Sequence, residues 1–140
     1  MLSNYLEVTN ADNEKVMEEN KIENFGEPCP VRSLLDRIGD KWPMLVISLL
    51  GGFGTLRFNE LNQKMGTISQ KMLTITLKNL EADGLISRKM YAQIPPRVEY
   101  SLTNLGISLL PTIDALSNWA LANIPEVMES RERYKNRNQA

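Results

Sequence analysis

The sequence predicts a mainly α-helical domain with one small β-hairpin. Three observations support this prediction. Residues 69–83 place apolar side chains on one helical face and amide, hydroxyl and ammonium groups on the other. A short helical segment and a glycine-containing turn precede them. Residues 85–91 and 97–102 follow, and both alternate as strands do. With 140 residues and 42% hydrophobic content, the chain can form one modest core.

The first 26 residues are expected to form an acidic N-terminal arm. The segment that ends at Pro28 contains seven acidic and two basic residues and has no sustained apolar face. The sequence allows two interpretations of this arm. In the first, Asn10 or Asp12 caps a short helix that runs through Glu18; in the second, the arm is flexible.

Residues 27–124 are expected to form the main domain. Two prolines lead into a helix with apolar residues at helical spacing, and Gly39 ends it. Asp40 is the expected N-cap of a second helix, and Pro43 is tolerated in its first turn. This second helix is apolar almost all round, which places it in the centre of the core. The glycine-rich residues 51–54 are expected to break it.

A short helix is predicted from Asn59 to about Met65, followed by a tight turn at Gly66 and Thr67. Ser69 is then the expected N-cap of the amphipathic helix. The predicted core side of that helix consists of Met72, Leu73, Thr76, Leu77 and Leu80. Two helices joined by such a turn form a helix-turn-helix pattern, which on its own is a weak signal.

The two strand-like segments make the fold prediction more specific. Val98, Tyr100 and Leu102 fall on one face of the second strand, and residues 92–96 connect the strands through two prolines. A helix-turn-helix followed directly by a hairpin is a winged helix-turn-helix, in which the hairpin is the wing.

Thr103 is the expected N-cap of a last helix with apolar residues at spacings of three and four. Pro111 is expected to bend this helix and Pro125 to end it, which leaves residues 125–140 as a C-terminal tail helix. The helix carries more apolar surface than a small domain needs, which predicts additional N- and C-terminal dimerisation helices and a homodimer. The dimerisation candidates are Leu34, Leu116, Trp119 and Ala120.

Charge and composition exclude several classes of protein. The net charge is −1, but residues 29–102 contain ten basic and six acidic residues, so a basic centre lies behind the acidic arm. There is no histidine, and neither a nucleophile beside a base nor a glycine-rich phosphate loop is evident. We therefore expect no enzyme, no cofactor and no metal site. The sequence shows no membrane-spanning run and no signal peptide, and its single cysteine agrees with a cytoplasmic location.

Four motifs in combination resemble the HxlR family of bacterial winged-helix transcription regulators, relatives of the MarR proteins. They are Gly-Asp-Lys-Trp at 39–42, Phe-Asn-Glu-Leu at 58–61, Leu-Glu-Ala-Asp-Gly-Leu at 80–85 and Pro-Pro-Arg-Val-Glu-Tyr at 95–100. The resemblance covers Cys29 to about Trp119. It implies a homodimer, of repressor type, that places two recognition helices in successive major grooves of double-stranded DNA at a pseudo-palindromic operator.

The resemblance implies two sets of DNA-binding residues. Ser69, Gln70, Lys71 and Thr74 are expected nearest the bases, and Lys78, Arg88, Lys89 and Arg97 are expected on phosphates. The alternative for each single lysine is a solvated helix face. The alternative for the whole chain is a winged-helix module that binds protein without specific DNA binding.

Cys29 is a candidate redox-sensing residue, because it precedes a helix N-terminus and lies close to Arg32 in the sequence. Some regulators of the resembled family use a cysteine at this place to sense oxidants or electrophiles. The alternative is a small buried residue with an inert thiol. A small-molecule effector that binds between the last helix and the core also stays open.

Overall fold

The structure, a computed structural model, describes residues 30–139. The chain divides into two compact units, of which the first ends at Lys41 and the second begins at Trp42. In the first unit the described helix is α3 (Pro30–Ile38), and it buries no side chain. The predicted acidic arm and Cys29 lie outside the described residues.

Helix α4 (Lys41–Phe53) supplies the centre of the core, as predicted, and buries Val46, Ile47 and Leu50. The predicted break within residues 51–54 is confirmed, and the helix continues through the first two glycines to Phe53. A glycine inside a helix costs only about 1 kcal/mol relative to alanine. The chain leaves the helix only at Gly54, where φ is +81°.

The helix-turn-helix consists of α5 (Phe58–Met65) and α6 (Gln70–Ala82). Gly66, at a φ of +74°, allows the tight turn between them. The Ser69 side chain accepts a hydrogen bond of 3.0 Å from the backbone N–H of Met72, which confirms it as the N-cap of α6.

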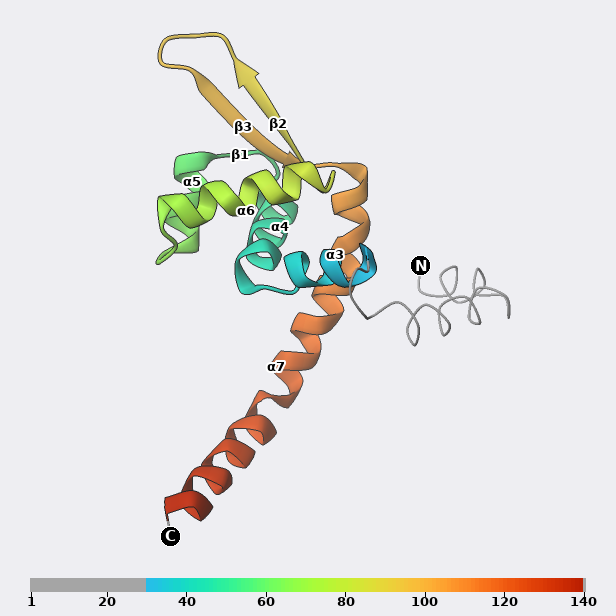
Figure 1. Cartoon of the computed structure of the whole chain (residues 1–140), viewed down its shortest axis with the longest axis vertical. Coiled ribbons are helices and arrows are strands. Elements are labelled where there is room, and N and C mark those ends of the chain that lie inside the picture. Colours follow the sequence, from blue (N-terminus) through green and yellow to red (C-terminus); the bar gives the residue numbers. More distant parts are fainter. Residues whose placement is uncertain (1–29, 140) are drawn as a thin grey trace, which may run out of the picture. The chain divides into compact units, whose positions relative to one another are not determined.

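An antiparallel sheet in the order β1-β3-β2 pairs one strand that precedes α5 with two strands that follow α6 (Figure 1). Strand β2 (Ile86–Tyr91) and strand β3 (Arg97–Leu102) form the predicted hairpin, which we call the wing together with its loop. Strand β1 (Leu56–Arg57) was not predicted, since a segment of two residues is too short to show alternation. Figure 1 shows the tip of the wing extending beyond α5 and α6.

The core of the second unit lies between α4, α5, α6 and the sheet. Its fully buried side chains are Val46, Ile47, Leu50, Leu61, Leu73, Leu80 and Ile86. The prediction that Met72 belongs to the core side is wrong, since Met72 is 42% exposed. At 100° per residue Met72 falls at the edge of the buried arc of α6, where the neighbouring elements do not cover it.

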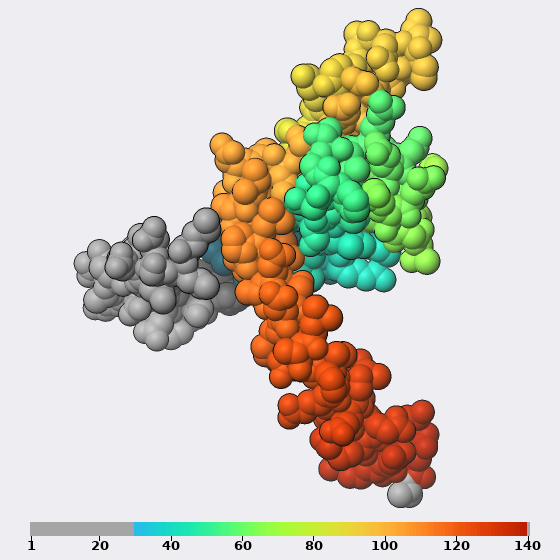
Figure 2. Space-filling view, turned by 180° about the vertical axis from the view of Figure 1, so that it is seen from behind, coloured from blue at the N-terminus to red at the C-terminus, as the bar shows by residue number. Residues whose placement is uncertain are grey.

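Helix α7 (Asn104–Gln139) begins at the predicted cap, where the backbone N–H of Gly106 donates to the Thr103 hydroxyl at 3.1 Å. The predicted end at Pro125 is wrong, because the helix continues through both internal prolines. Each proline removes one backbone hydrogen bond, while the bonds of the adjacent turns hold the helix together. Figures 1 and 2 show the second half of α7 standing clear of α4, α5 and α6. None of the helices between residues 30 and 139 could cross a membrane.

Candidate nucleic-acid interface

The outward face of α6 carries the four polar side chains that the sequence analysis assigned to its working side. Gln70, Lys71, Thr74 and Lys78 are all exposed. The opposite face buries Leu73, Thr76, Leu77 and Leu80. This division follows from the helical period, because residues three and four apart share a face. The exposed face offers donors and acceptors of the kinds that contact base edges and phosphates.

Two hydroxyl groups near the start of α6 are already hydrogen-bonded within the chain. The Ser69 hydroxyl oxygen accepts the capping bond, so its O–H remains able to donate. The Thr74 hydroxyl donates to the Gln70 carbonyl at 2.8 Å, so its oxygen remains able to accept. Ser69 therefore suits an acceptor such as a phosphate oxygen, and Thr74 suits a donor.

Two apolar side chains, Met72 and Ile75, are also exposed on α6, each by 42%. At 100° per residue Ile75 projects close to Lys71 and Lys78, in the middle of the outward face. An apolar group at that place could contact a thymine methyl group or an apolar partner.

The basic residues of the wing lie on two different faces of the sheet. Arg88 is the cross-strand partner of Tyr100, whereas Lys89 is the partner of Glu99. Successive side chains of a strand point to opposite faces of a sheet. Arg88 therefore lies on the face of the buried Tyr100, and its Nε is 3.9 Å from a Glu81 carboxylate oxygen on α6.

Lys89 and Arg97 lie on the other face, around the ring of Tyr91. The Lys89 ammonium is 5.0 Å from the ring centroid, and the Arg97 guanidinium carbon is 4.2 Å from it. Arg97 Nε also lies 3.2 Å from a carboxylate oxygen of Glu99. Arg57 of β1 is the other cross-strand partner of Glu99 and joins this face. Arg57 was not predicted as a site residue, because its neighbours become evident only once β1 is paired with β3.

A hollow of about 380 Å³ is lined by residues of α5, α6 and the sheet and brings three predicted DNA-binding residues together. Its lining consists of Phe58, Thr74, Leu77, Lys78, Glu81, Arg88 and Tyr100. Burial raises the pKa of the Tyr100 hydroxyl above 10.0, and the nearby Glu81 carboxylate acts in the same direction. The positive charge of Arg88 acts the other way. Tyr100 is therefore a neutral hydroxyl at the edge of a basic surface.

The dimerisation candidates of α7 are exposed. Leu116 is 54% exposed and Trp119 60%, and Ala120 is exposed as well. Further exposed apolar residues on the same helix are Leu105, Ile107, Leu121, Ile124 and Met128. In α3, Leu34 is exposed by 42%. Exposed apolar side chains in this number on one helix are typical of a protein interface.

The part of the chain between residues 30 and 139 contains no group of three or more cysteine, aspartate or glutamate side chains that could hold a metal ion. Cys29, the candidate redox-sensing residue, precedes the described residues.

Residues 37–128 match the HxlR-like helix-turn-helix family. An uncharacterised HTH-type transcriptional regulator of Halalkalibacterium halodurans is 46% identical over 103 residues, which make up 74% of this chain and 90% of that protein. A solved structure of YtfH from Salmonella typhimurium is similar with a TM-score of 0.71 at 42% identity, covering 77% of this chain and 96% of that one.

A structure of the redox regulator HypR in its reduced form is also similar. Its TM-score is 0.64 at 42% identity, and the match covers 72% of this chain and 98% of HypR. The oxidised form of HypR has a TM-score of 0.61 at 43% identity, with 68% of this chain and 97% of HypR covered.

Proposed function

This chain belongs to the HxlR-like helix-turn-helix family of transcriptional regulators, and we propose that it acts as a homodimeric repressor on a pseudo-palindromic operator. One observation carries the proposal, namely the outward face of α6. Its exposed polar groups include two lysines, for which residues 30–139 show no ion pair. Lysines without a carboxylate partner remain available for phosphates and base edges.

In this proposal α6 is the recognition helix and enters a major groove. Ser69, Gln70, Lys71 and Thr74 are nearest the bases, while Lys78 and the basic side chains of the wing contact phosphates. Arg88 shares a hollow with Lys78 and Thr74, which supports a contact close to α6. Lys89 and Arg97 lie on the opposite face of the wing and would reach a different part of the backbone.

In this proposal the second copy packs on the exposed apolar residues of α7, and Leu34 of α3 is a separate candidate contact. Two recognition helices related by a twofold axis contact half-sites about 34 Å apart, or a multiple of that distance. A protein bound over two successive grooves excludes other proteins from that duplex, which is why we propose repression.

The test is binding of the full chain to an inverted-repeat promoter fragment, followed by fluorescence anisotropy. We expect the affinity to fall steeply with salt, because each neutralised phosphate releases counterions. Lys71→Ala should reduce the preference for the operator over an unrelated duplex. Lys135→Ala, on an exposed part of α7 beyond the family match, is the matched control and should leave that preference unchanged. An unaltered preference in Lys71→Ala would contradict the assignment of α6.

We further propose that oxidation of Cys29 controls DNA binding. The similarity to HypR, a redox regulator, supports this. Because Cys29 is the chain's one cysteine, the oxidised form must be an intersubunit disulfide, a mixed disulfide or an adduct. Diamide should abolish operator binding by the wild-type protein and leave binding by Cys29→Ser intact. Equal loss in both proteins would refute the role of Cys29.

The alternative function is binding of another protein through α6, and the exposed Met72 and Ile75 favour it. The same anisotropy assay separates the two functions. A protein-binding module would show weak affinity and no preference between the operator and an unrelated duplex. A replacement of Ile75 by alanine would then leave DNA binding unchanged, whereas a contact to thymine methyl groups predicts weaker binding to the operator.

A further inference from the structure

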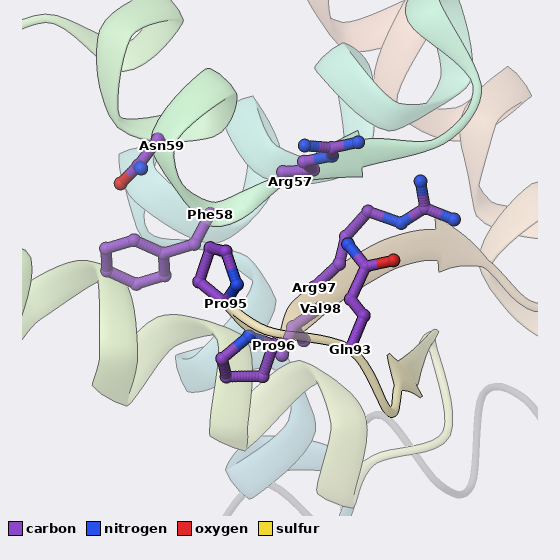
Figure 3. A pocket seen from close by; sticks show the side chains of 8 residues that line it. All are labelled: Arg57, Phe58, Asn59, Gln93, Pro95, Pro96, Arg97 and Val98. Carbon is purple, nitrogen blue, oxygen red and sulfur yellow. The ribbon is translucent and has the colours of Figure 1, made fainter.

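A second hollow, of about 360 Å³, lies between the start of α5 and the wing (Figure 3). Its lining consists of Arg57, Phe58, Asn59, Gln93, Pro95, Pro96, Arg97 and Val98. The polar side chains among these are two guanidinium groups and two amides, and no carboxylate lines the hollow. Figure 3 shows Arg57, Arg97 and Gln93 on one side of it and the Phe58 ring on the other. Such a lining is suited to an anion.

The strand register explains why positive charge gathers here. Glu99 is the cross-strand partner of both Arg57 and Lys89, so these three side chains share one face of the sheet. Arg97 lies two residues from Glu99 and therefore shares that face. One carboxylate thus stands among three cations. This face of the sheet keeps a surplus of positive charge even when Glu99 is ionised.

Arg97 is held in place without using all of its donors. Its guanidinium lies over the Tyr91 ring at 4.2 Å, which fixes the plane of the group. Its contact with Glu99 brings opposite charges together, but Nε has no hydrogen-bond acceptor in good geometry. A guanidinium stacked on a ring still presents its edge to an acceptor, and that edge matches the oxygens of a phosphate.

We propose that this hollow binds one phosphate group, with Arg57 and Arg97 as the charged donors and the Gln93 amide as a third donor. The proposal rests on the proposed function, because the phosphate it assigns is a backbone phosphodiester of the bound duplex, beyond the bases that α6 reads. It adds Arg57, which lies outside the helix-turn-helix, to the DNA-contacting surface. Glu99 is a positioning residue that holds Arg97 in the free protein.

The test compares Arg57→Ala with the wild-type chain. The substitution should not disturb α5, because the capping contact there uses the Arg57 backbone N–H, which donates to a Glu60 carboxylate oxygen at 3.1 Å. We expect about tenfold weaker binding to every duplex, and a salt slope reduced by about one. Arg133→Ala is the matched control, since Arg133 is an exposed arginine on α7 that faces Glu129.

Binding to methylphosphonate duplexes identifies which backbone phosphate occupies the hollow. Each duplex carries one uncharged linkage in the sequence that flanks the operator. At the contacted position the wild type should lose about tenfold in affinity, whereas Arg57→Ala should lose clearly less, because only the contacts of Arg97 and Gln93 remain to be removed. Competition with inorganic pyrophosphate at constant ionic strength tests whether a free anion, and not a DNA phosphate, binds in the hollow. Displacement of DNA from the wild type but not from Arg57→Ala would assign the same hollow to a free anion.

The proposal is overturned if Arg57→Ala behaves like Arg133→Ala in both experiments. It is also overturned if neutralising any flanking phosphate weakens the wild type and Arg57→Ala equally, since Arg57 would then act only through general charge. Failure of the proposed function looks different. In that case Lys71→Ala would leave sequence preference unaltered, whatever the result at Arg57.

Discussion

Neighbouring residues in this chain occupy different electrostatic surroundings, and the wing shows this best. Arg88 and Lys89 are adjacent in sequence, yet one faces Glu81 of α6 and the other faces the ring of Tyr91. The alternation of a β-strand is the cause. A pair of basic residues in a hairpin therefore cannot be assigned to one phosphate strand from sequence order alone. The cross-strand register decides which partners each of them has.

At the residue scale, Gly106 is the position where a small change should cost most. A Cβ added there would lie 2.1 Å from the Leu85 carbonyl oxygen, which is a backbone atom that cannot move alone. We expect Gly106→Ala to lower the free energy of unfolding by about 3 kcal/mol, measured by urea denaturation. Gly52→Ala is the control, since nothing lies within 4 Å of its added Cβ. It should raise stability by roughly 0.5–1 kcal/mol. Similar effects at both glycines would contradict the close approach of α7 to Leu85.

Tyr100 makes stability depend on alkaline pH. Burial raises the pKa of its hydroxyl in the folded state above 10.0. The unfolded chain therefore releases this proton at a lower pH than the folded chain does. Its contribution to stability is full below the unfolded pKa and is lost as the pH rises through the folded pKa. Between about pH 9 and pH 11 the wild type should lose more stability than Tyr100→Phe, in urea denaturation at each pH. Parallel pH profiles would show that burial of this hydroxyl has no such effect.

At the scale of elements, prediction succeeded where a regular period extends over several turns. The buried and exposed faces of α6 follow from the helical spacing, and Met72 alone fell on the wrong side, at the edge of the buried arc. The hairpin could be predicted from the sequence, because the alternation of side chains continues for six residues in each strand. Strand β1 could not be predicted from the sequence, because two residues are too few to show an alternating pattern. The strand exists only through its pairing with β3.

Proline misled the prediction of one helix end, since α7 continues through Pro125. The glycines of α4 lie in helical backbone, and Gly51 allows the Leu110 side chain of α7 to approach, since a Cβ there would meet it at 2.7 Å. The break expected within residues 51–54 occurs at Gly54, where φ is positive, and not at the first two glycines. Of the candidate site, the outward side chains of α6 could be predicted, whereas the surroundings of Arg57 and Arg88 depend on contacts between distant elements.

Pro125 should make the second half of α7 the weakest part of that helix. The proline removes the hydrogen bond to the Leu121 carbonyl, and a proline costs about 3 kcal/mol relative to alanine in a helix interior. Pro125→Ala should slow amide hydrogen exchange around residues 121–129 by about 10- to 100-fold, measured by mass spectrometry or NMR. Pro96→Ala in the wing loop is the control and should leave exchange in α7 unaltered. Unchanged protection in Pro125→Ala would mean that neighbouring turns already compensate for the missing bond.

At the scale of the whole molecule, the described chain has more apolar surface than it can bury. In α7 the last buried side chain is Ile113, and the larger apolar residues beyond it are exposed. Each such side chain gains about 1.5–3 kcal/mol when it is fully removed from water. A helix that stands clear of its own core is stable only marginally by itself. A second copy that covers α7 would account for both features and would place two recognition helices on one duplex.

We expect Trp119 to contribute most to such a subunit contact, because large aromatic side chains dominate the energy of protein interfaces. Trp119→Ala should weaken the dimer by at least 2 kcal/mol, or about 30-fold in the dissociation constant, measured by sedimentation equilibrium. Operator binding should weaken with it, since a monomer contacts only one half-site. Tyr134→Ala is the matched control, an aromatic residue 62% exposed on the same helix but beyond the family match. It should leave both dimerisation and operator binding intact. A Trp119→Ala protein that sediments as the wild type does would place the subunit contact elsewhere, and the spacing of the half-sites would then need another explanation.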